Sequence, residues 1–184
     1  MKNFTRKNPL FALCGLNCAL CSMHLGGYCP GCGGGDGNQS CAIARCSVTH
    51  GVEYCSQCGE YPCKSYDKFD AYDSFITHRS RHSNLMQAKA VGYENYLLEL
   101  NEKSVILNEL LQKYNDGRRK TFYSVAVNLL SLEELRKVME QVTLTEHLDM
   151  MTSKEKAAVA VGYFQETAAK KGIELKLFKK PKTK

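Results

Sequence analysis

Hydrophobic residues in the last two thirds of the chain recur every three or four positions, the spacing typical of amphipathic helices. This period covers residues 65–77 and 84–114. Gly92 and the polar stretch 101–103 are expected to break the second segment in two. The Asn-Asp-Gly sequence at 115–117 then predicts a stop and a turn. The chain beyond its first third is therefore expected to be mainly helical.

Two more helices are predicted toward the C-terminus. Ser131 and Glu134 have the spacing of a capping box, which opens a helix over residues 132–142. Residues 153–171 again have helical periodicity, and Gly172 stands where a helix C-cap is expected.

Residues 173–178 alternate apolar and polar side chains, the period of a β-strand. A single strand needs a partner, and two segments qualify. Residues 122–127 are rich in β-branched side chains but fit a helix equally well, and residues 10–13 precede the first cysteine. The pattern does not decide between them.

The first 64 residues differ from the rest, because they are rich in Gly, Cys and turn formers. The glycine-rich stretch 31–37 predicts a loop and lacks the Lys-Ser/Thr pair of a phosphate-binding loop. We expect a Cys-rich metal-binding module over residues 1–64 and a mainly helical domain over 65–184. The fold class is α+β, mainly α, with an N-terminal Cys-rich zinc-knuckle module packed on a helical domain with a short C-terminal strand.

The composition is that of a soluble globular protein, with 43% hydrophobic and 24% charged residues among 184. No apolar run approaches the roughly 20 residues that cross a bilayer, so no membrane partner is expected. The basic N-terminus is followed by too short an apolar stretch for a secretory signal. These features predict a cytoplasmic protein.

All ten cysteines lie between positions 14 and 63. An even number of cysteines invites a disulfide interpretation, but the cytosol keeps thiols reduced. A segment with little apolar periodicity needs staples, and here metal ions fit better than disulfides. The sequence predicts metal ligands at Cys14, Cys18, Cys21, Cys29, Cys32, Cys41, Cys46, Cys55, Cys58 and Cys63.

The spacing of these cysteines favours zinc, because a C-x2-C pair presents two sulfurs to one tetrahedral ion. The pairs Cys18/Cys21 and Cys29/Cys32 are close enough in sequence to share one site. The third pair, Cys55/Cys58, needs two further ligands, for which we favour Cys46 and Cys63.

This partition leaves Cys14 and Cys41 as free thiols or as bridges in a multinuclear cluster. His24 and His50 also lie in the segment and are substitute ligands, although a surface position is the simpler interpretation for each.

An iron–sulfur cluster is the alternative cofactor. Cys14, Cys18 and Cys21 have the C-x3-C-x2-C spacing of radical-SAM enzymes, and Pro30 follows Cys29 as in some ferredoxins. Ferredoxin spacing itself fails because seven residues separate Cys21 from Cys29. The helical remainder also lacks the strands of a radical-SAM barrel.

The distribution of charge argues against nucleic-acid binding by the Cys-rich segment. The chain carries a net charge of +6, yet Arg45 is the single basic residue between positions 8 and 63. A phosphate-binding finger needs a basic surface. Basic residues cluster after position 78 instead, at Arg79, Arg81, Arg118, Arg119, Lys120 and the lysine-rich tail of Lys170, Lys171, Lys176, Lys179, Lys180, Lys182 and Lys184.

Four phrases resemble the cysteine-rich prokaryotic family known as domain of unknown function 3795. They are Cys14-Gly-Leu-Asn-Cys18-Ala-Leu-Cys21, Cys29-Pro-Gly-Cys32, Cys41-Ala-Ile-Ala-Arg-Cys46 and Gly51-Val-Glu-Tyr-Cys55-Ser-Gln-Cys58-Gly-Glu-Tyr-Pro-Cys63. The resemblance covers the first 64 residues and extends more loosely through 115–120 and 128–130. It implies a zinc-binding protein and no particular reaction.

The favoured function is a zinc-binding protein with a structural four-cysteine module and a helical part that binds a protein or small ligand. Such a protein need not be an enzyme. One alternative is a redox enzyme that uses an iron–sulfur cluster or a free thiol at Cys14 or Cys41. The other is a nucleic-acid-associated regulator that uses the basic patches after residue 78.

Overall fold

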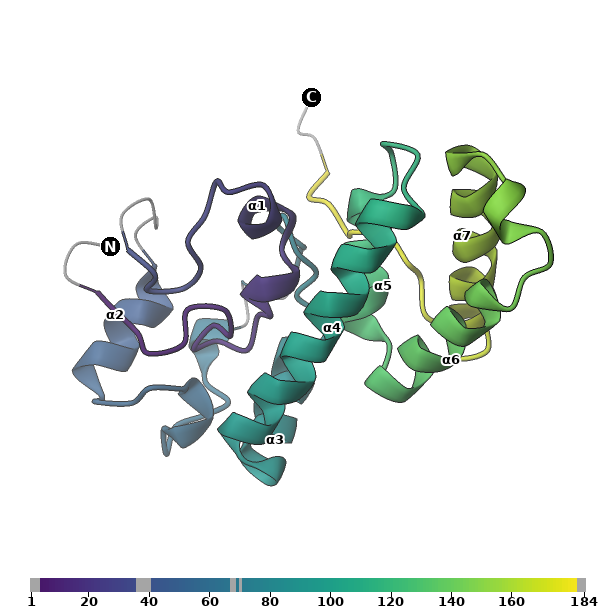
Figure 1. Ribbon diagram of the computed structural model, residues 1–184. Helices are drawn as coiled ribbons and strands as arrows, with labels where there is room; N and C mark the ends of the chain where they lie inside the picture. Colours follow the sequence, from purple (N-terminus) through teal and green to yellow (C-terminus); the bar gives the residue numbers. More distant parts are fainter. Residues whose placement is uncertain (1–3, 36–40, 67–68, 70, 182–184) are drawn as a thin grey trace. The chain divides into compact units, whose positions relative to one another are not determined.

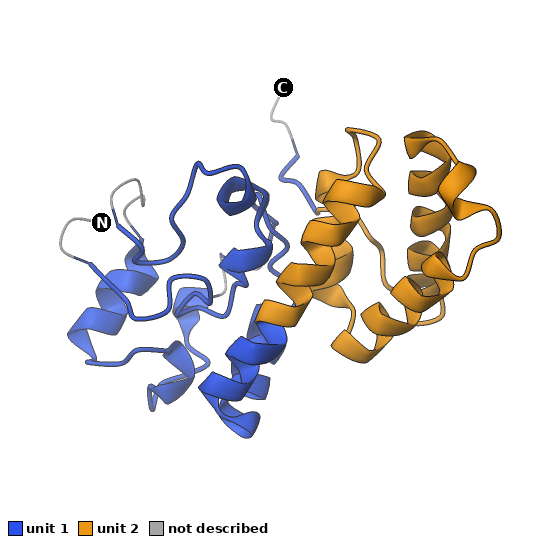
Figure 2. Ribbon diagram, in the orientation of Figure 1, with its two compact units in different colours: residues 1–100, 178–184 blue, residues 101–177 orange. Residues whose placement is uncertain are grey.

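The structure is a computed structural model that describes residues 4–35, 41–66, 69 and 71–181. The chain divides into two compact units (Figure 2). Unit 1 comprises residues 1–100 and 178–184, and unit 2 comprises residues 101–177. The predicted boundary after residue 64 falls inside unit 1. Part of the predicted glycine loop (36–37) and two tail lysines, Lys182 and Lys184, lie outside the described residues.

Unit 1 begins with short helices joined by irregular segments and ends with longer helices (Figure 1). The helix that closes unit 1 continues into unit 2. Along the chain the elements are η1 (Cys18–Leu20), α1 (Ser22–Leu25), α2 (Ala42–Thr49), η2 (Cys55–Gln57), η3 (Lys64–Tyr66), α3 (Arg81–Val91) and α4 (Tyr93–Lys113). Gly92 separates α3 from α4 as predicted, whereas the polar stretch 101–103 does not interrupt α4.

Aromatic side chains hold the cysteine-rich segment against α3 and the start of α4 within unit 1. The ring of Phe11 lies 5.3 Å from that of Tyr54 and 4.6 Å from that of Tyr96. Tyr54 stacks on Tyr93 at 4.2 Å. The Tyr96 hydroxyl donates to the buried Asn17 side chain at 3.0 Å. The loops that carry the cysteines therefore rest on a helical support.

Gly15 fixes a second contact with α3. Its φ is +91°, and a Cβ at this position would lie 2.1 Å from the Arg81 carbonyl oxygen. Asn84 donates to the Gly15 carbonyl at 2.9 Å. Only glycine permits this approach, which brings Cys14 next to the first turn of α3.

Unit 2 contains the rest of α4 and four further elements. They are α5 (Lys120–Leu129), α6 (Leu132–Thr143), η4 (Leu148–Met150) and α7 (Ser153–Ala169). The predicted capping box opens α6, where the Ser131 side chain accepts from the Glu134 N–H. A second box at Thr152 and Glu155 opens α7. In the described part of the chain, no helix has the length and apolar character needed to cross a membrane.

The predicted helix over 65–77 is wrong. Among the described residues of this range only the 3-10 turn η3 forms, and residues 71–80 are turns and irregular segments. The Asp73 carboxylate accepts from the His78 N–H at 2.7 Å and from the Thr77 hydroxyl at 3.3 Å, and such local bonds compete with a helix. The apolar residues of this segment do not form one buried face either, since Tyr66 and Ile76 are buried whereas Phe75 is 59% exposed.

The predicted C-terminal strand also does not form, and the described residues contain no strand, so the observed fold is mainly helical rather than α+β. Residues 122–127 lie inside α5 and give residues 173–178 no partner. The alternation of apolar and polar side chains is still seen in their exposure, because Ile173, Leu175 and Leu177 are half-buried between exposed neighbours. Phe178 pairs with Asp73, accepting from its N–H at 2.8 Å and donating to its carboxylate at 2.9 Å.

Candidate metal centre

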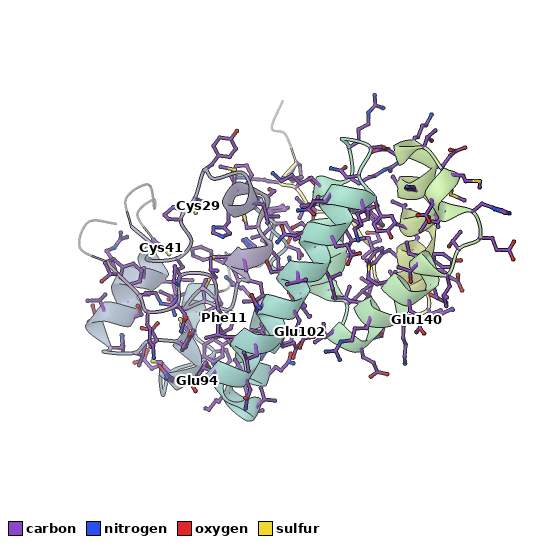
Figure 3. The ribbon with its side chains drawn as sticks, viewed as in Figure 1. Phe11, Cys29, Cys41, Glu94, Glu102 and Glu140 are labelled. Atoms are coloured by element: carbon purple, nitrogen blue, oxygen red, sulfur yellow. The ribbon has the colours of Figure 1, made fainter. Side chains whose placement is uncertain are left out.

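None of the ten cysteines forms a disulfide, and each is partly exposed. They lie on loops, 3-10 turns and the short helix α2. Cys29 follows α1 in a loop, and Cys41 is the N-cap of α2 (Figure 3). Eight of the ten fall into two groups.

The first thiol group consists of Cys14, Cys18, Cys32 and Cys41. Cys14 interacts electrostatically with both Cys32 and Cys41, and Cys18 interacts with Cys14 and Cys32. Cys21 is a further neighbour of Cys18. The structure therefore brings Cys14 and Cys41, which the spacing left without a site, next to members of the predicted first knuckle.

Packing around the first thiol group opposes ionisation of its sulfurs. Desolvation raises the pKa of Cys14 to about 12, and the neighbouring Cys32 and Cys41 add to the rise. The pKa of Cys18 and that of Cys32 are raised for the same main reason. A metal ion that binds these sulfurs has to displace their protons, because metals bind the thiolate form.

Two buried arginines favour negative charge at the first thiol group. The Arg81 guanidinium partly offsets the rise in the pKa of Cys14. Arg6 partly offsets the rise in the pKa of Cys32 through its charge and a hydrogen bond. Arg81 is only 1% exposed, and its guanidinium carbon lies 4.3 Å from the Tyr66 ring centroid. The Arg6 side chain is 2% exposed and pairs with Glu53 at 2.9 Å.

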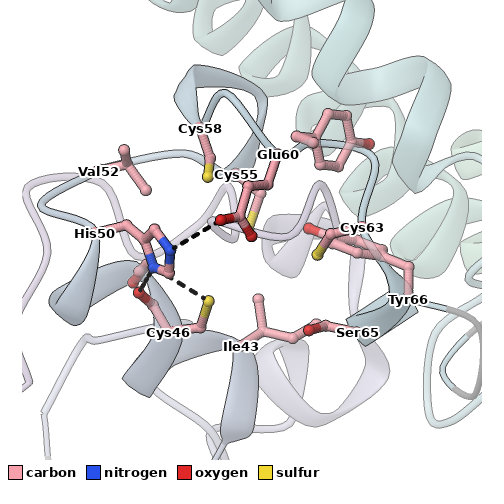
Figure 4. A pocket seen from close by; sticks show the side chains of 12 residues that line it. Ile43, Cys46, His50, Val52, Cys55, Cys58, Glu60, Cys63, Ser65 and Tyr66 are labelled. Carbon is pink, nitrogen blue, oxygen red and sulfur yellow. Dashed lines mark hydrogen bonds and ion pairs between the residues drawn. The ribbon is translucent and has the colours of Figure 1, made fainter.

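The second thiol group consists of Cys46, Cys55, Cys58 and Cys63. These four cysteines line one cavity of about 30 Å³ together with His50, Glu60 and Tyr66. Their side chains point into the cavity (Figure 4). This volume has room for an ion or one or two waters, whereas organic ligands occupy roughly 300–1,000 Å³. The structure thus places Cys46 and Cys63 around the same cavity as the Cys55/Cys58 pair.

Burial raises the pKa of Cys55 to about 11, and the nearby Tyr66 hydroxyl opposes that rise. The nearby sulfurs of Cys63, Cys46 and Cys58 add to it. Any cation in the cavity would relieve this mutual repulsion of the thiolates.

A small apolar cluster separates the two groups. It consists of four buried residues, Leu13, Ile43, Ala44 and Tyr66. Cysteines of both groups pack against it, namely Cys14, Cys32, Cys41, Cys55 and Cys63. Phe11, Leu20 and Tyr54 are buried elsewhere in the segment, so this cluster is only the part of the core that lies next to the thiols. Small cores of this kind usually depend on metals or cross-links.

The donor set fits a thiophilic metal, because each group offers four sulfurs and the second adds an imidazole. Within residues 4–35, 41–66, 69 and 71–181, however, no three His, Cys, Asp or Glu side chains are arranged closely enough to hold a metal ion. The thiols gather in space without forming a finished coordination shell.

Sequence reasoning missed the two arginines at the first thiol group. In the sequence Arg81 belongs to the cluster of basic residues after position 78, and arginine is rarely buried. Nothing in the sequence marks Arg6 or Arg81 as different from other arginines. Their positions follow from tertiary contacts, such as the approach of Gly15 to Arg81.

Several of the basic residues after position 78 are engaged within the protein. Arg81 is buried, and the Arg79 guanidinium lies 4.3 Å from the Phe178 ring centroid. Arg119 pairs with Asp116 at 3.2 Å. The 79/81 pair therefore does not form the solvated basic patch that phosphate binding requires.

Comparison of the chain with protein-family models, with curated proteins and with solved structures finds no match.

Proposed function

We propose that this protein binds zinc at two four-cysteine sites, which stabilise its N-terminal segment. Cys14, Cys18, Cys32 and Cys41 would hold one ion. Cys46, Cys55, Cys58 and Cys63 would hold the other. Zinc held by four thiolates is closed to substrate and supplies folding free energy rather than catalysis.

The observation that carries this proposal is the second thiol group. Cysteines from α2, from η2 and from the loop before η3 all reach one ion-sized cavity. These positions are up to 17 residues apart in sequence, so their convergence is a property of the fold. Cysteines that served only as small apolar residues would not need to gather around a cavity.

The size of the cavity favours zinc over an iron–sulfur cluster. A cubane of four irons and four sulfides needs much more space than the about 30 Å³ available between these sulfurs. One ion fits that space without displacing the apolar cluster beside it.

A free-thiol enzyme is the weaker proposal. A reactive cysteine needs a lowered pKa, whereas desolvation raises that of Cys14 to about 12. Cys14 and Cys41 also lie beside other sulfurs rather than apart from them. Both features fit metal ligands better than a nucleophile.

The helical part remains the proposed binding site for a protein or small ligand. Within unit 2 a groove of about 390 Å³ is lined by Phe122, by α7 residues near Ala168 and by residues 173–176. Its volume falls in the range of small-molecule sites.

We further propose cytoplasmic localisation and membership in the cysteine-rich prokaryotic family that the sequence resembles.

Matched pairs of substitutions test the partition of the ligands. The double variant Cys14→Ser/Cys41→Ser is expected to bind one zinc fewer than the wild-type protein, because it removes half of the first thiol group. The double variant Cys21→Ser/Cys29→Ser is expected to keep the wild-type zinc content. Zinc per chain, measured by elemental analysis after gel filtration, gives the comparison.

The reverse result would contradict this partition. If Cys21→Ser/Cys29→Ser loses zinc and Cys14→Ser/Cys41→Ser keeps it, then the ligands follow the sequence spacing of Cys18, Cys21, Cys29 and Cys32. Loss of zinc in neither variant would show that the first thiol group binds no metal.

A further inference from the structure

The cavity of the second thiol group offers a donor, His50, in addition to the four sulfurs that a tetrahedral ion needs. His50 lines the same cavity as Cys46, Cys55, Cys58 and Cys63. Cys46 lies in α2 and His50 caps that helix one turn later. Residues four apart share a helix face, so both side chains reach the cavity from the same side (Figure 4).

The hydrogen bond of His50 determines which ring nitrogen carries its hydrogen. Nδ1 lies 2.9 Å from the Cys46 carbonyl oxygen, which can only accept. Nδ1 therefore donates, and Nε2 of the neutral ring keeps its lone pair. A backbone carbonyl bonded to one imidazole nitrogen is the arrangement that prepares the other nitrogen to bind a metal.

The same bond argues against a nucleophile–base pair of Cys46 and His50. The Cys46 sulfur lies 3.5 Å from Nδ1, but that nitrogen already carries a hydrogen and cannot accept another from the thiol. Nε2 is 3.9 Å from the Glu60 carboxylate, longer than a hydrogen bond, and Glu60 is mostly exposed. Nothing in these contacts holds Nε2 away from the cavity.

We propose that His50 is an alternative ligand of the second site and exchanges with Cys46. This inference rests on the proposed zinc site. In the exchange the lone pair of His50 Nε2 replaces that of the Cys46 sulfur, while Cys55, Cys58 and Cys63 stay bound. No electrons are transferred, and the departing thiolate takes a proton from solvent. The site thereby presents Cys46 as a thiol that can be released without loss of the metal.

The test uses the full-length protein loaded with Co²⁺, whose sulfur-to-metal charge-transfer absorption grows with the number of bound thiolates. Cys46→Ser is expected to keep about two metal ions per chain, and the absorption of the second site should fall by about a quarter. His50→Ala should keep the metal content and spectrum of the wild-type protein. The double variant Cys46→Ser/His50→Ala should lose one ion.

The outcomes separate this inference from the proposed function. If Cys46→Ser alone loses the ion to the same extent as the double variant, His50 is not a ligand and the inference is overturned. If the wild-type protein binds no metal, the proposed function fails as well. The ion retained at the first site shows that the double variant is folded.

A second measurement leaves all four cysteines in place. Alkylation of the zinc-loaded protein with iodoacetamide, mapped by mass spectrometry, should modify Cys46 before Cys55, Cys58 and Cys63. His50→Ala removes the alternative ligand and should slow the modification of Cys46, whereas Thr49→Ala, an exposed neighbour on α2, should not. Equal rates in the wild-type protein and His50→Ala would overturn the exchange.

Discussion

Removal of zinc with a strong chelator is expected to unfold the cysteine-rich segment and to leave unit 2 folded. Next to its thiol groups the segment has a cluster of four buried apolar residues, while Phe11, Leu20 and Tyr54 are buried elsewhere in it. A structural zinc ion contributes roughly 10–16 kcal/mol to folding in zinc-finger peptides, as much as the roughly 5–15 kcal/mol that stabilise a whole domain. Unit 2 has its own core, which includes Leu107, Tyr123 and Phe164.

Hydrogen exchange measured by mass spectrometry resolves the two units. Peptides that contain α2 and the Leu13–Cys55 backbone bond should lose at least about 100-fold protection on chelation. Peptides from α6 and α7 should keep theirs. Unchanged protection across α2 in metal-free protein would show that the apolar cluster suffices and that metal is not structural.

Replacement of Arg81 is expected to weaken metal binding at the first thiol group without touching a ligand. In Arg81→Met the buried positive charge beside Cys14 is lost, so the bound thiolates remain desolvated and uncompensated. Substitution of groups that support metal ligands typically lowers affinity by about 10–100-fold. Competition with a chromophoric chelator should show this loss for one of the two ions.

Arg45→Met is the matched control, because Arg45 is an exposed arginine on α2 of the same unit. Its effect on affinity should be less than about twofold, since exposed charges interact weakly. Arg6→Met provides an independent variant, as Arg6 contacts Cys32 rather than Cys14. Equal affinities in Arg81→Met, Arg6→Met and Arg45→Met would show that the buried arginines do not support metal binding.

The helices that were predicted correctly are marked by residues at their own ends. Gly92 ends α3 with a φ of +89°, and the Ser131/Glu134 box caps α6 through bonds three residues apart. The helix predicted over residues 65–77 does not form, because an apolar helical face requires a surface that covers it. The Asp73 carboxylate also offers the backbone hydrogen bonds that compete with a helix. The alternation at 173–178 correctly indicated which side chains are half-buried, but pairing depends on a second strand, which the described part of the chain does not supply.

The thiol groups show the same difference between features set by local sequence and features set by long-range packing. Cys55 and Cys58 are three residues apart, and C-x2-C spacing alone places both at one cavity. Cys14 and Cys41 join Cys32 through long-range packing around Leu13 and Ile43, which no local pattern encodes. The burial of Arg81 likewise depends on residues far away in sequence, so the charge environment of the first group was not predictable.

Metal analysis and an absorbance spectrum of freshly purified protein decide whether the ten cysteines bind zinc. Two thiol groups predict about two zinc ions per chain and no absorption in the visible range, because zinc has a filled d shell. Brown protein that contains iron and acid-labile sulfide, or protein without any bound metal under reducing conditions, would contradict the account.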